Sequence, residues 1–517
     1  MLFRSVEPAV KSGFFGTKRR AFTNSCGFMS PGFTVEVRRQ LGLSYPEPSA
    51  LQVQYQGFQG TLVLKDVLTN APQVQLRKSM QKFNIPNQEV HQHIPFIGIL
   101  DYSKPHINGY LDTRLIILLQ SRGVLINYLQ TLHIQYIDFL RKILDDPASA
   151  QFFLRLKGRD AANIRSEIDG PTREVLTTIK RNEIEEMIDR SYVPDAEDDE
   201  PPRRSLARVR VLVPKARVVF GVCDPHNKLE KGQCYFKPTL LDDEAGDLSS
   251  EEQVVVARYP CYHPGDIQVL TLTHKKTGYE NLKDCLVLPG KDNAFESCRG
   301  DLGGSKFFVS WDQQLVPKRA IQPCSYSLTM KEYTSEALAR VRANVKWLFK
   351  RNRERRKRCR AELIEHFANF MDDLPQRIEK TYMKLAVTLG PYSKQCKQLS
   401  KMSYQAANQT VDKDVLSQKL AMFEKNERRT MSSAEASSSE GSPLLRTGEE
   451  GEGEAGNGNE DEGVTSVEIV NLNGTGSVRF LCVSSRETSA EMRHEVWKLE
   501  ERAKKFVEEA LQEDPYV

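Results

Sequence analysis

The stretch from Leu206 to Val316 most constrains the fold, because it consists of short β-prone pieces divided by Pro and Gly. Pieces this short do not make helices of ordinary length, and the turn residues between them end each strand. The predicted strands are Val209–Val213, Arg217–Val222, Cys234–Phe236, Val254–Tyr259, Ile267–Thr273, Cys285–Leu288 and Phe307–Trp311. Short, closely spaced strands are typical of closed β architectures. The sequence therefore predicts a β-barrel here.

Helical segments are predicted on both sides of the barrel. Leu and Ile recur three or four residues apart from Tyr110 to about Leu156, and the helical layer continues from Arg173 to Asp189. After Trp311 the same spacing returns from Ser335 to about Met422 on a charged background. The predicted fold class is α+β, a barrel flanked by helical domains.

Changes of composition set the domain boundaries. The acidic run between prolines has almost nothing to bury, and the Ser-, Gly- and Glu-rich stretch near the C-terminus cannot offset the entropy of ordering. The predicted parts are a strand-rich segment at 1–105, a helical region at 106–193, a linker at 194–204, the barrel at 205–325, a helical region with a basic tract at 326–430, a disordered acidic segment at 431–466, and a short strand followed by a helix at 467–517.

Charge is segregated along the chain, although the net charge is only +4. Lys346–Arg360 carries nine basic residues and one acid, whereas Glu449–Glu462 carries seven acids and no base. The basic tract predicts contact with RNA phosphates, with Trp347 and Phe349 able to stack on bases, or a nuclear import signal. A solvated helix face is the plain alternative.

Neither a membrane span nor a secretion signal is predicted. The apolar run Leu115–Leu119 is far shorter than the roughly 20 residues that cross a bilayer, and the first 20 residues contain no apolar core of a signal peptide. The ten cysteines include no C-x-x-C pair, and His91 and His93 have no third metal ligand beside them. We expect an intracellular protein, nuclear or cytoplasmic, with reduced thiols and no membrane partner.

The most informative string is CRGDLGGSKFFVSWD at residues 298–312, a Gly-rich turn with one carboxylate that leads into an aromatic strand. It resembles the catalytic turn of the cellular, silencing-type RNA-dependent RNA polymerases, whose signature is G-G-D-L-D-G-D followed by an aromatic strand and W-D. The trailing residues FFVSWD fit that signature.

Further blocks resemble the same family in the same order. They are SALQVQY at 49–55 leading to Gly60, QLRKSMQKF at 75–83, RVVFGVCDPHNKLEKGQCYF at 217–236, and VARYPCYHPGD at 256–266. The resemblance spans about residues 20–410. It implies that the barrel is a double-psi β-barrel, the second barrel of the family, and that the strand-rich segment at 1–105 is a remnant of the first-barrel region. Because family members are considerably longer, it also implies a missing half.

The resemblance implies a magnesium site, and this sequence departs from it. In the family three aspartates converge on Mg²⁺, which lowers the charge on the attacking oxygen and the α-phosphate. Asp301 matches the first aspartate and is the expected catalytic metal ligand, but Gly303 and Ser305 stand at the second and third positions. One carboxylate and a hydroxyl supply far less charge than three carboxylates, so the predicted site is disabled and Mg²⁺ should bind weakly.

Other positions bear on the same site. Gln59 stands where a related turn of the family has a lysine, so it cannot supply that cation. Asp292 and Glu296 are substitute ligands only if their loop reaches the metal, and acids in such loops are usually solvated. The His263–Asp266 turn either positions substrate or template, or is a structural turn in which Asp266 satisfies its own backbone.

Basic residues in the matching blocks and in the basic tract are the predicted contacts for RNA and nucleotides. They are Arg77, Lys82, Lys215, Arg217, Arg258, Lys346, Arg351, Arg355 and Arg356. The implied partners are single-stranded template RNA, ribonucleoside triphosphates if the chain is active, and proteins of a silencing complex.

Two functions follow from these expectations. The first is a polymerase-family member whose ancestral reaction makes double-stranded RNA for small-RNA silencing, impaired or inactive in this chain because the metal turn is broken. The second is a non-catalytic RNA-binding or scaffold protein of a silencing complex. The enzyme requires Mg²⁺-dependent nucleotide incorporation, whereas the scaffold requires RNA or partner binding that is indifferent to Mg²⁺.

Overall fold

The computed structural model describes most of the chain, in two compact units. The described residues are 2–6, 25–43, 47–66, 71–82, 96–159, 164, 167–188, 208–240, 252–273, 278–290, 302–324, 326, 374–407, 411, 413, 415–425 and 485–513. The first unit contains Met1–Ser325 and Val496–Val517, and the second contains Tyr326–Glu495. The predicted linker at 194–204, the basic tract and the acidic segment at 431–466 lie outside the described residues.

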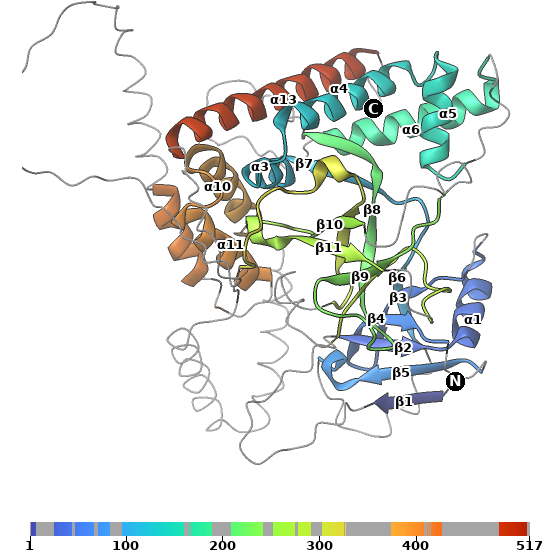
Figure 1. Cartoon of the computed structure of the whole chain (residues 1–517). Helices are drawn as coiled ribbons and strands as arrows, with labels where there is room; N and C mark the ends of the chain where they lie inside the picture. The colour runs from blue at the N-terminus through green and yellow to red at the C-terminus, as the bar shows by residue number, and fades with distance from the viewer. Residues whose placement is uncertain are drawn as a thin grey trace, which may run out of the picture. The chain divides into compact units, whose positions relative to one another are not determined.

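The first unit begins with a six-stranded sheet (Figure 1). Its strands pair in the order β1-β5-β2-β4-β3-β6. Their bounds are β1 Leu2–Val6, β2 Cys26–Met29, β3 Ala50–Tyr55, β4 Phe58–Leu64, β5 Gln73–Arg77 and β6 Gly98–Tyr102. Helix α1, Pro31–Leu41, was not predicted in this strand-rich segment, although Ser30 and Pro31 carry a start signal. The Ser30 side chain caps this helix by accepting a hydrogen bond from the Phe33 N–H at 3.3 Å.

The predicted closed barrel follows. Its strands pair in the order β12-β9-β11-β10-β13-β8, and a further pairing of β12 with β8 closes the ring. Their bounds are β8 Arg210–Cys223, β9 Gln233–Phe236, β10 Gln253–Arg258, β11 Ile267–Leu272, β12 Cys285–Leu288 and β13 Lys306–Ser310. The two pieces predicted on either side of Pro214 form the single strand β8. The expectation of a closed barrel is therefore confirmed.

The first sheet and the barrel share one strand topology. In each, the first strand in chain order runs parallel to the fifth and the second runs parallel to the fourth. The fifth is antiparallel to the second, the fourth to the third, and the third to the sixth. The barrel also pairs its sixth strand with its first, β13 with β8, and no such pair is present among the described strands of the first sheet. The same arrangement is thus built twice in this unit.

One hydrophobic core joins the two sheets. Leu51 and Leu62 of the first sheet belong to the same buried cluster as Phe307 and Val309 of β13. Burying apolar area from both sheets together stabilises their association as well as each sheet. The two sheets therefore form one packed body.

Helices cover the side of the barrel away from the first sheet, as Figure 1 shows for α4, α6 and α13. Their bounds are α3 Thr113–Ser121, α4 Ile126–Lys142, α5 Pro147–Leu156, α6 Gly170–Met187 and α13 Ser485–Glu513. The sequence pattern placed Tyr110 and Leu111 in a helix, but they lie in strand β7, Asn108–Asp112, which pairs with β8. Pairing with this long neighbouring strand overrides the local helical spacing.

The described part of the second unit is helical. It contains α10, Leu374–Leu389, α11, Lys394–Ala407, and helical residues 415–425. Tyr326 stacks on Tyr404 with ring centroids 5.1 Å apart, and its hydroxyl lies 2.9 Å from that of Ser400. No helix in the described part of the chain combines the length and apolar character needed to cross a bilayer.

Candidate functional site

The Gly-rich turn lies directly before β13. Leu302 is fully buried, Gly304 adopts a left-handed conformation with φ +89°, and the Gly304 N–H donates to the Leu302 carbonyl at 2.7 Å. Positive φ favours glycine, so the backbone requires glycine at position 304. Asp301, the predicted metal ligand, lies outside the described residues.

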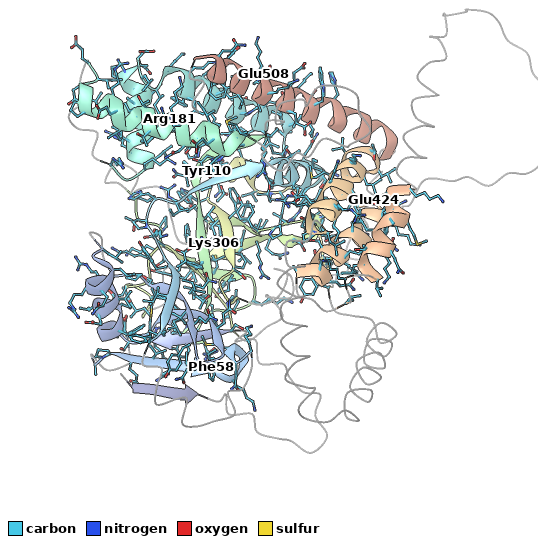
Figure 2. All side chains as sticks on the ribbon, turned by 180° about the vertical axis from the view of Figure 1, so that it is seen from behind. Phe58, Tyr110, Arg181, Lys306, Glu424 and Glu508 are labelled. Atoms are coloured by element: carbon cyan, nitrogen blue, oxygen red, sulfur yellow. The ribbon has the colours of Figure 1, made fainter. Side chains whose placement is uncertain are left out.

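The first sheet holds this turn in place. The Thr61 hydroxyl of β4 donates to the Leu302 carbonyl and accepts from the Gly304 N–H, each at 2.8 Å. Lys306, at the start of β13, forms a 2.8 Å ion pair with Asp101 of β6. Figure 2 shows Lys306 between Tyr110 of β7 and Phe58 of β4. The candidate site therefore lies where the two sheets meet.

The donor set of the turn does not fit a magnesium ion. Gly303 has no side chain, and Ser305 offers one hydroxyl on a residue that is 9% exposed. Asp101, the acid bound to Lys306, is engaged by both Lys306 and Lys104. Burial alone would raise the pKa of Asp101, but these two ammonium groups hold it below its usual value. Asp292 and Glu296 lie outside the described residues.

A lysine lies close to the turn at 57–60. Gly57 has φ +83°, and Gln59 is paired across the hairpin with Gln54. The Lys82 N–H donates to the Gly57 carbonyl at 2.8 Å, and the Lys82 ammonium donates to the Ser25 hydroxyl at 3.1 Å. The fold thus brings a cation from the following sequence block to the base of this turn.

Two of the predicted RNA contacts point into the protein. Arg217 is 1% exposed, and its guanidinium donates to the carbonyls of Pro214 and Ala216 at 3.1 and 3.0 Å. Arg77 is 9% exposed and lies over the Phe28 ring, with 4.4 Å between the guanidinium carbon and the ring centroid. Internal carbonyls thus bind the Arg217 guanidinium and an aromatic ring lies against that of Arg77, and RNA contact at either residue stays a prediction.

The remaining predicted contacts divide between the surface and the part of the chain that is not described. Lys215 is exposed on β8, and Arg258 is partly exposed at the end of β10. Lys346, Arg351, Arg355 and Arg356 of the basic tract lie outside the described residues, as do His91 and His93. The described surface cations among the predictions are therefore Lys82, Lys215 and Arg258.

The His263–Asp266 turn is built from its own backbone contacts. The Asp266 carboxylate accepts from the N–H groups of Tyr262 and His263 at 3.4 and 3.1 Å, and His263 Nδ1 accepts from the Gly265 N–H at 3.0 Å. Asp266 is 1% exposed. Of the two alternatives for this turn, these contacts favour the structural one.

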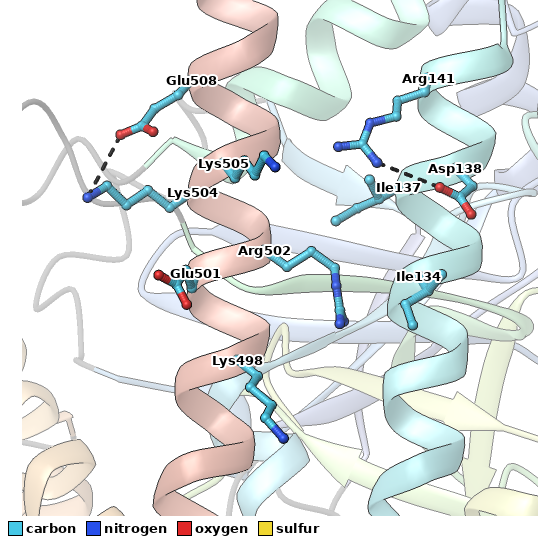
Figure 3. Close-up of a pocket in the computed structure, with 10 residues that line it drawn as sticks. All are labelled: Ile134, Ile137, Asp138, Arg141, Lys498, Glu501, Arg502, Lys504, Lys505 and Glu508. Carbon is cyan, nitrogen blue, oxygen red and sulfur yellow. Dashed lines mark ion pairs between the residues drawn. The ribbon is translucent and has the colours of Figure 1, made fainter.

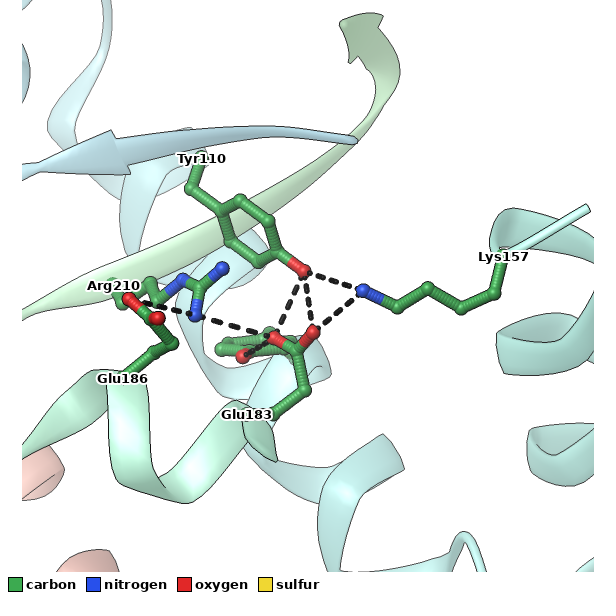
Figure 4. Close-up of polar contacts among 6 residues, drawn as sticks. Tyr110, Lys157, Glu183, Glu186 and Arg210 are labelled. Atoms are coloured by element: carbon green, nitrogen blue, oxygen red, sulfur yellow. Dashed lines mark hydrogen bonds and ion pairs between the residues drawn. The ribbon is translucent and has the colours of Figure 1, made fainter. Parts of the chain in front are cut away.

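A buried charge cluster that the sequence did not reveal lies at the helical side of the barrel (Figure 4). The Glu183 carboxylate accepts from the hydroxyls of Tyr110 and Tyr136 at 2.8 and 2.6 Å and pairs with the Lys157 ammonium at 2.7 Å. Arg210 of β8 lies 3.7 Å from the same carboxylate. These contacts join α6 to β7, α4, the end of α5 and β8, so we assign the cluster a structural role.

The helical layer also contacts the W-D segment. The Tyr128 hydroxyl of α4 donates to the Asp312 carboxylate, which accepts in addition from the Gln314 N–H at 3.0 Å. Trp311 packs beside Phe236, with ring centroids 5.9 Å apart. The W-D end of this string is thus a junction between barrel and helices.

Comparison with known proteins identifies the scaffold. A sequence profile described as RNA dependent RNA polymerase matches residues 7–414. The chain is 29% identical over 325 residues to "Probable RNA-dependent RNA polymerase 1" of Oryza sativa subsp. japonica, covering 60% of this chain and 40% of that protein. It is 27% identical over 340 residues to "RNA-dependent RNA polymerase 2" of Arabidopsis thaliana, covering 59% of this chain and 27% of that protein.

A solved structure shares the fold. "RNA dependent RNA polymerase QDE-1 from Thielavia terrestris" superposes with a TM-score of 0.54 at 16% identity, covering 79% of this chain and 46% of that chain. The chain thus spans 40% and 27% of the length of the two plant relatives and under half of this structure.

Proposed function

The chain belongs to the eukaryotic cellular RNA-dependent RNA polymerase family, and from this premise we propose that it binds single-stranded RNA without copying it efficiently. The reaction implied by the family is template-directed joining of ribonucleoside triphosphates to give double-stranded RNA for silencing. In this chain the scaffold for that reaction is retained, while the metal centre is not assembled.

The observation that carries the proposal is the chemistry of the Gly-rich turn. Two positions where the family has carboxylates are occupied by Gly303 and the buried Ser305. Mg²⁺ demands near-octahedral oxygen coordination and dehydrates reluctantly, so it needs charged ligands held in place. Asp301 alone cannot replace three carboxylates. When bound in the family's active members, the metal would supply charge stabilisation at the reacting phosphate.

The strand topology supports the proposal that both sheets are double-psi barrels of this family. Each has the two parallel pairs, first with fifth and second with fourth, set among antiparallel neighbours. On this proposal residues 1–105 form the first-barrel region and 205–325 the second barrel. The turn then lies between the two barrels, held by Thr61.

RNA binding rests on cations at the surface of the first unit. Lys82, Lys215 and Arg258 are at least partly exposed in the described structure, and the basic tract adds nine cations in sequence. Lys and Arg bind phosphates largely independently of base sequence. Such binding requires no metal, and it suits a role as a scaffold among silencing proteins.

The test compares the natural chain with the double variant Gly303→Asp plus Ser305→Asp. Nucleotide incorporation on single-stranded RNA is measured with Mg²⁺ and with Mn²⁺, and RNA binding is measured by fluorescence anisotropy. The single variants Gly303→Asp and Ser305→Asp serve as controls, because each restores only one carboxylate. We expect RNA binding by all four proteins and incorporation by the double variant alone.

The other outcomes are distinct. Efficient incorporation by the natural chain would show that the metal argument is wrong. Binding by all four proteins without incorporation by any would place a second defect outside the turn and leave the binding proposal standing. Absence of RNA binding by the natural chain would refute the binding proposal itself.

A further inference from the structure

A groove lies between α4 and α13 (Figure 3). Its volume is about 660 Å³. Helix α4 lines it with Ile134, Ile137, Asp138 and Arg141, and α13 lines it with Lys498, Glu501, Arg502, Lys504, Lys505 and Glu508. Five of these ten side chains are cationic and three are acidic.

The packing of α13 orients its cations. Leu499, Ala503, Phe506 and Val507 are buried in the core clusters of the first unit, which fixes the rotation of the helix. Lys498, Arg502 and Lys505 follow at spacings of four and three residues, so they share one flank of the helix. Figure 3 shows this flank facing α4, whereas Lys504 and Glu508, which form a 3.8 Å ion pair, point away.

Two acids beside the groove, Asp138 and Glu509, pair with a cation outside this flank. Asp138 pairs with Arg141 of its own helix at 3.7 Å, and Arg141 also pairs with Glu509 at 2.8 Å. Arg502 Nη1 is buried and has no hydrogen-bond partner among the described residues. A buried guanidinium N–H without an acceptor is costly, so Arg502 has unused hydrogen-bonding capacity among the described residues beside the groove.

A histidine of α4 that interacts electrostatically with Arg502 adds no charge to the groove. His133 of α4 is fully buried, and neither of its ring nitrogens has a partner in the described structure. Burial, together with the charge of Arg502, lowers the pKa of His133 to about 3, so the ring is neutral at physiological pH. On the side of α4, Ile134 and Ile137 give the groove an apolar wall opposite the positive flank.

We propose that this groove binds the phosphate backbone of single-stranded RNA, with Arg502 donating to one phosphate and Lys498 and Lys505 to its neighbours. The guanidinium fork matches two phosphate oxygens at once. From Lys498 to Lys505 the helix rises about 10 Å, a length that suits several phosphates better than one small anion. The identity of the ligand rests on the proposed function, since it takes RNA as the partner of this chain.

The first test is protection of lysine amines from acetylation in the intact chain, read by mass spectrometry with and without a single-stranded RNA oligonucleotide. We expect RNA to protect Lys498 and Lys505 and to leave Lys504 reactive. Lys504 is an internal control, because it is next to Lys505 and also belongs to the lining of the groove, but it points away from α4 and pairs with Glu508. Inorganic pyrophosphate and ATP form parallel arms, and protection by these as strong as by RNA would identify a small-phosphate site and overturn the RNA assignment.

The second test uses matched charge reversals. Lys505→Glu should weaken RNA binding by roughly fivefold or more and lower the salt dependence by about one counterion, whereas Lys504→Glu should change affinity less than twofold. Both variants change the net charge equally, and circular dichroism checks that both fold.

The outcomes separate this proposal from the proposed function. RNA binding with equal protection of Lys504 and Lys505, or with equal effects of the two reversals, would overturn the groove while leaving RNA binding by the chain intact. No RNA binding anywhere on the chain would overturn both.

Discussion

The Thr61 hydroxyl and the Gly304 N–H, which are 243 residues apart in the chain, are joined by a 2.8 Å hydrogen bond. The same hydroxyl donates to the Leu302 carbonyl at 2.8 Å. A strand of the first sheet thereby fixes the backbone of the turn without using any carboxylate of that turn. These two hydrogen bonds hold the described part of the turn, from Leu302 to Gly304, in a defined shape.

Thr61→Val should destabilise the first unit by about 1–3 kcal/mol. Valine has the same shape but leaves the Leu302 carbonyl and the Gly304 N–H without their side-chain partner in a buried place, and unpaired buried polar groups cost about this much. Urea denaturation followed by circular dichroism measures the effect. Thr131→Val is the matched control, because the Thr131 hydroxyl bonds only to its own helix on an exposed surface. Equal losses in both variants would contradict the anchoring role of Thr61.

Gly304→Ala should be more destabilising than Gly232→Ala. Both glycines have positive φ, +89° and +83°, so both variants incur the left-handed backbone cost of about 1–2 kcal/mol. A Cβ at 304 would also lie 2.3 Å from Gln52 Nε2, whereas a Cβ at 232 meets nothing within 4 Å. The difference in unfolding free energy between the two variants isolates the contact with Gln52.

A double variant checks this assignment. Adding Gln52→Ala to Gly304→Ala removes the crowding and should reduce the loss to that of Gly232→Ala, since residues in contact are not additive. A loss that Gln52→Ala leaves unchanged would show that Gln52 is not the obstacle.

The barrel could be predicted from sequence because its determinants are local. Short β-prone pieces bounded by Pro and Gly mark most strands, and Cys285–Leu288 was predicted with the bounds that β12 has. Helix α1 had a local signal as well, in Ser30 and Pro31. The repeated strand topology had no local signal in the sequence. Strand order depends on pairing between distant segments and leaves no fixed period in the sequence.

The site was less predictable, because its contacts are distant in sequence. Nothing in the Gly-rich string indicates that Thr61 forms hydrogen bonds with it. Arg217 follows a strand-like piece, where a cation is expected at the surface, but it is buried in the structure. Glu183 stands in the string EIEEM, which resembles a solvated helix face, yet it is 3% exposed. Only the fold shows that Lys157 and Arg210 lie beside the Glu183 carboxylate.

Glu183→Gln should destabilise the first unit by about 3–5 kcal/mol, since it removes one partner of a buried charge cluster and leaves Lys157 and Arg210 uncompensated. Burial alone would raise the pKa of Glu183, but Arg210 and Lys157 hold it below its usual value. The carboxylate therefore contributes stability above the unfolded pKa of about 4.3, and this stability is lost as the pH falls through the lower folded pKa.

The control for Glu183 is an exposed ion pair. Glu508→Gln breaks the contact with Lys504, where both side chains are more than half exposed, and should cost less than about 1 kcal/mol. Thermal unfolding of both variants at pH 7.5 and pH 4 compares them. If Glu183→Gln were as mild as Glu508→Gln, the cluster would not hold the helices to the barrel.

His133→Leu should stabilise the chain, and more so in acid. Among the described residues the buried imidazole has no partner for either ring nitrogen, so an apolar side chain of similar size removes a penalty of about 1–3 kcal/mol. Its folded pKa of about 3 lies below the ordinary histidine pKa of about 6.5, because burial and, next, Arg502 disfavour the charged ring.

Between these two pKa values the unfolded chain binds a proton at His133 that the folded chain does not, so this residue makes the folded state less stable as the pH falls from about 6.5 toward 3. Denaturation at pH 7.5 and pH 4.5 should therefore show a larger gain for His133→Leu at the lower pH. Arg502→Leu should reduce the acid dependence without abolishing it, because burial remains the larger cause. A gain that is the same at both pH values would mean that His133 is protonated equally in the folded and unfolded states, and it would remove the physical basis for a neutral ring beneath Arg502.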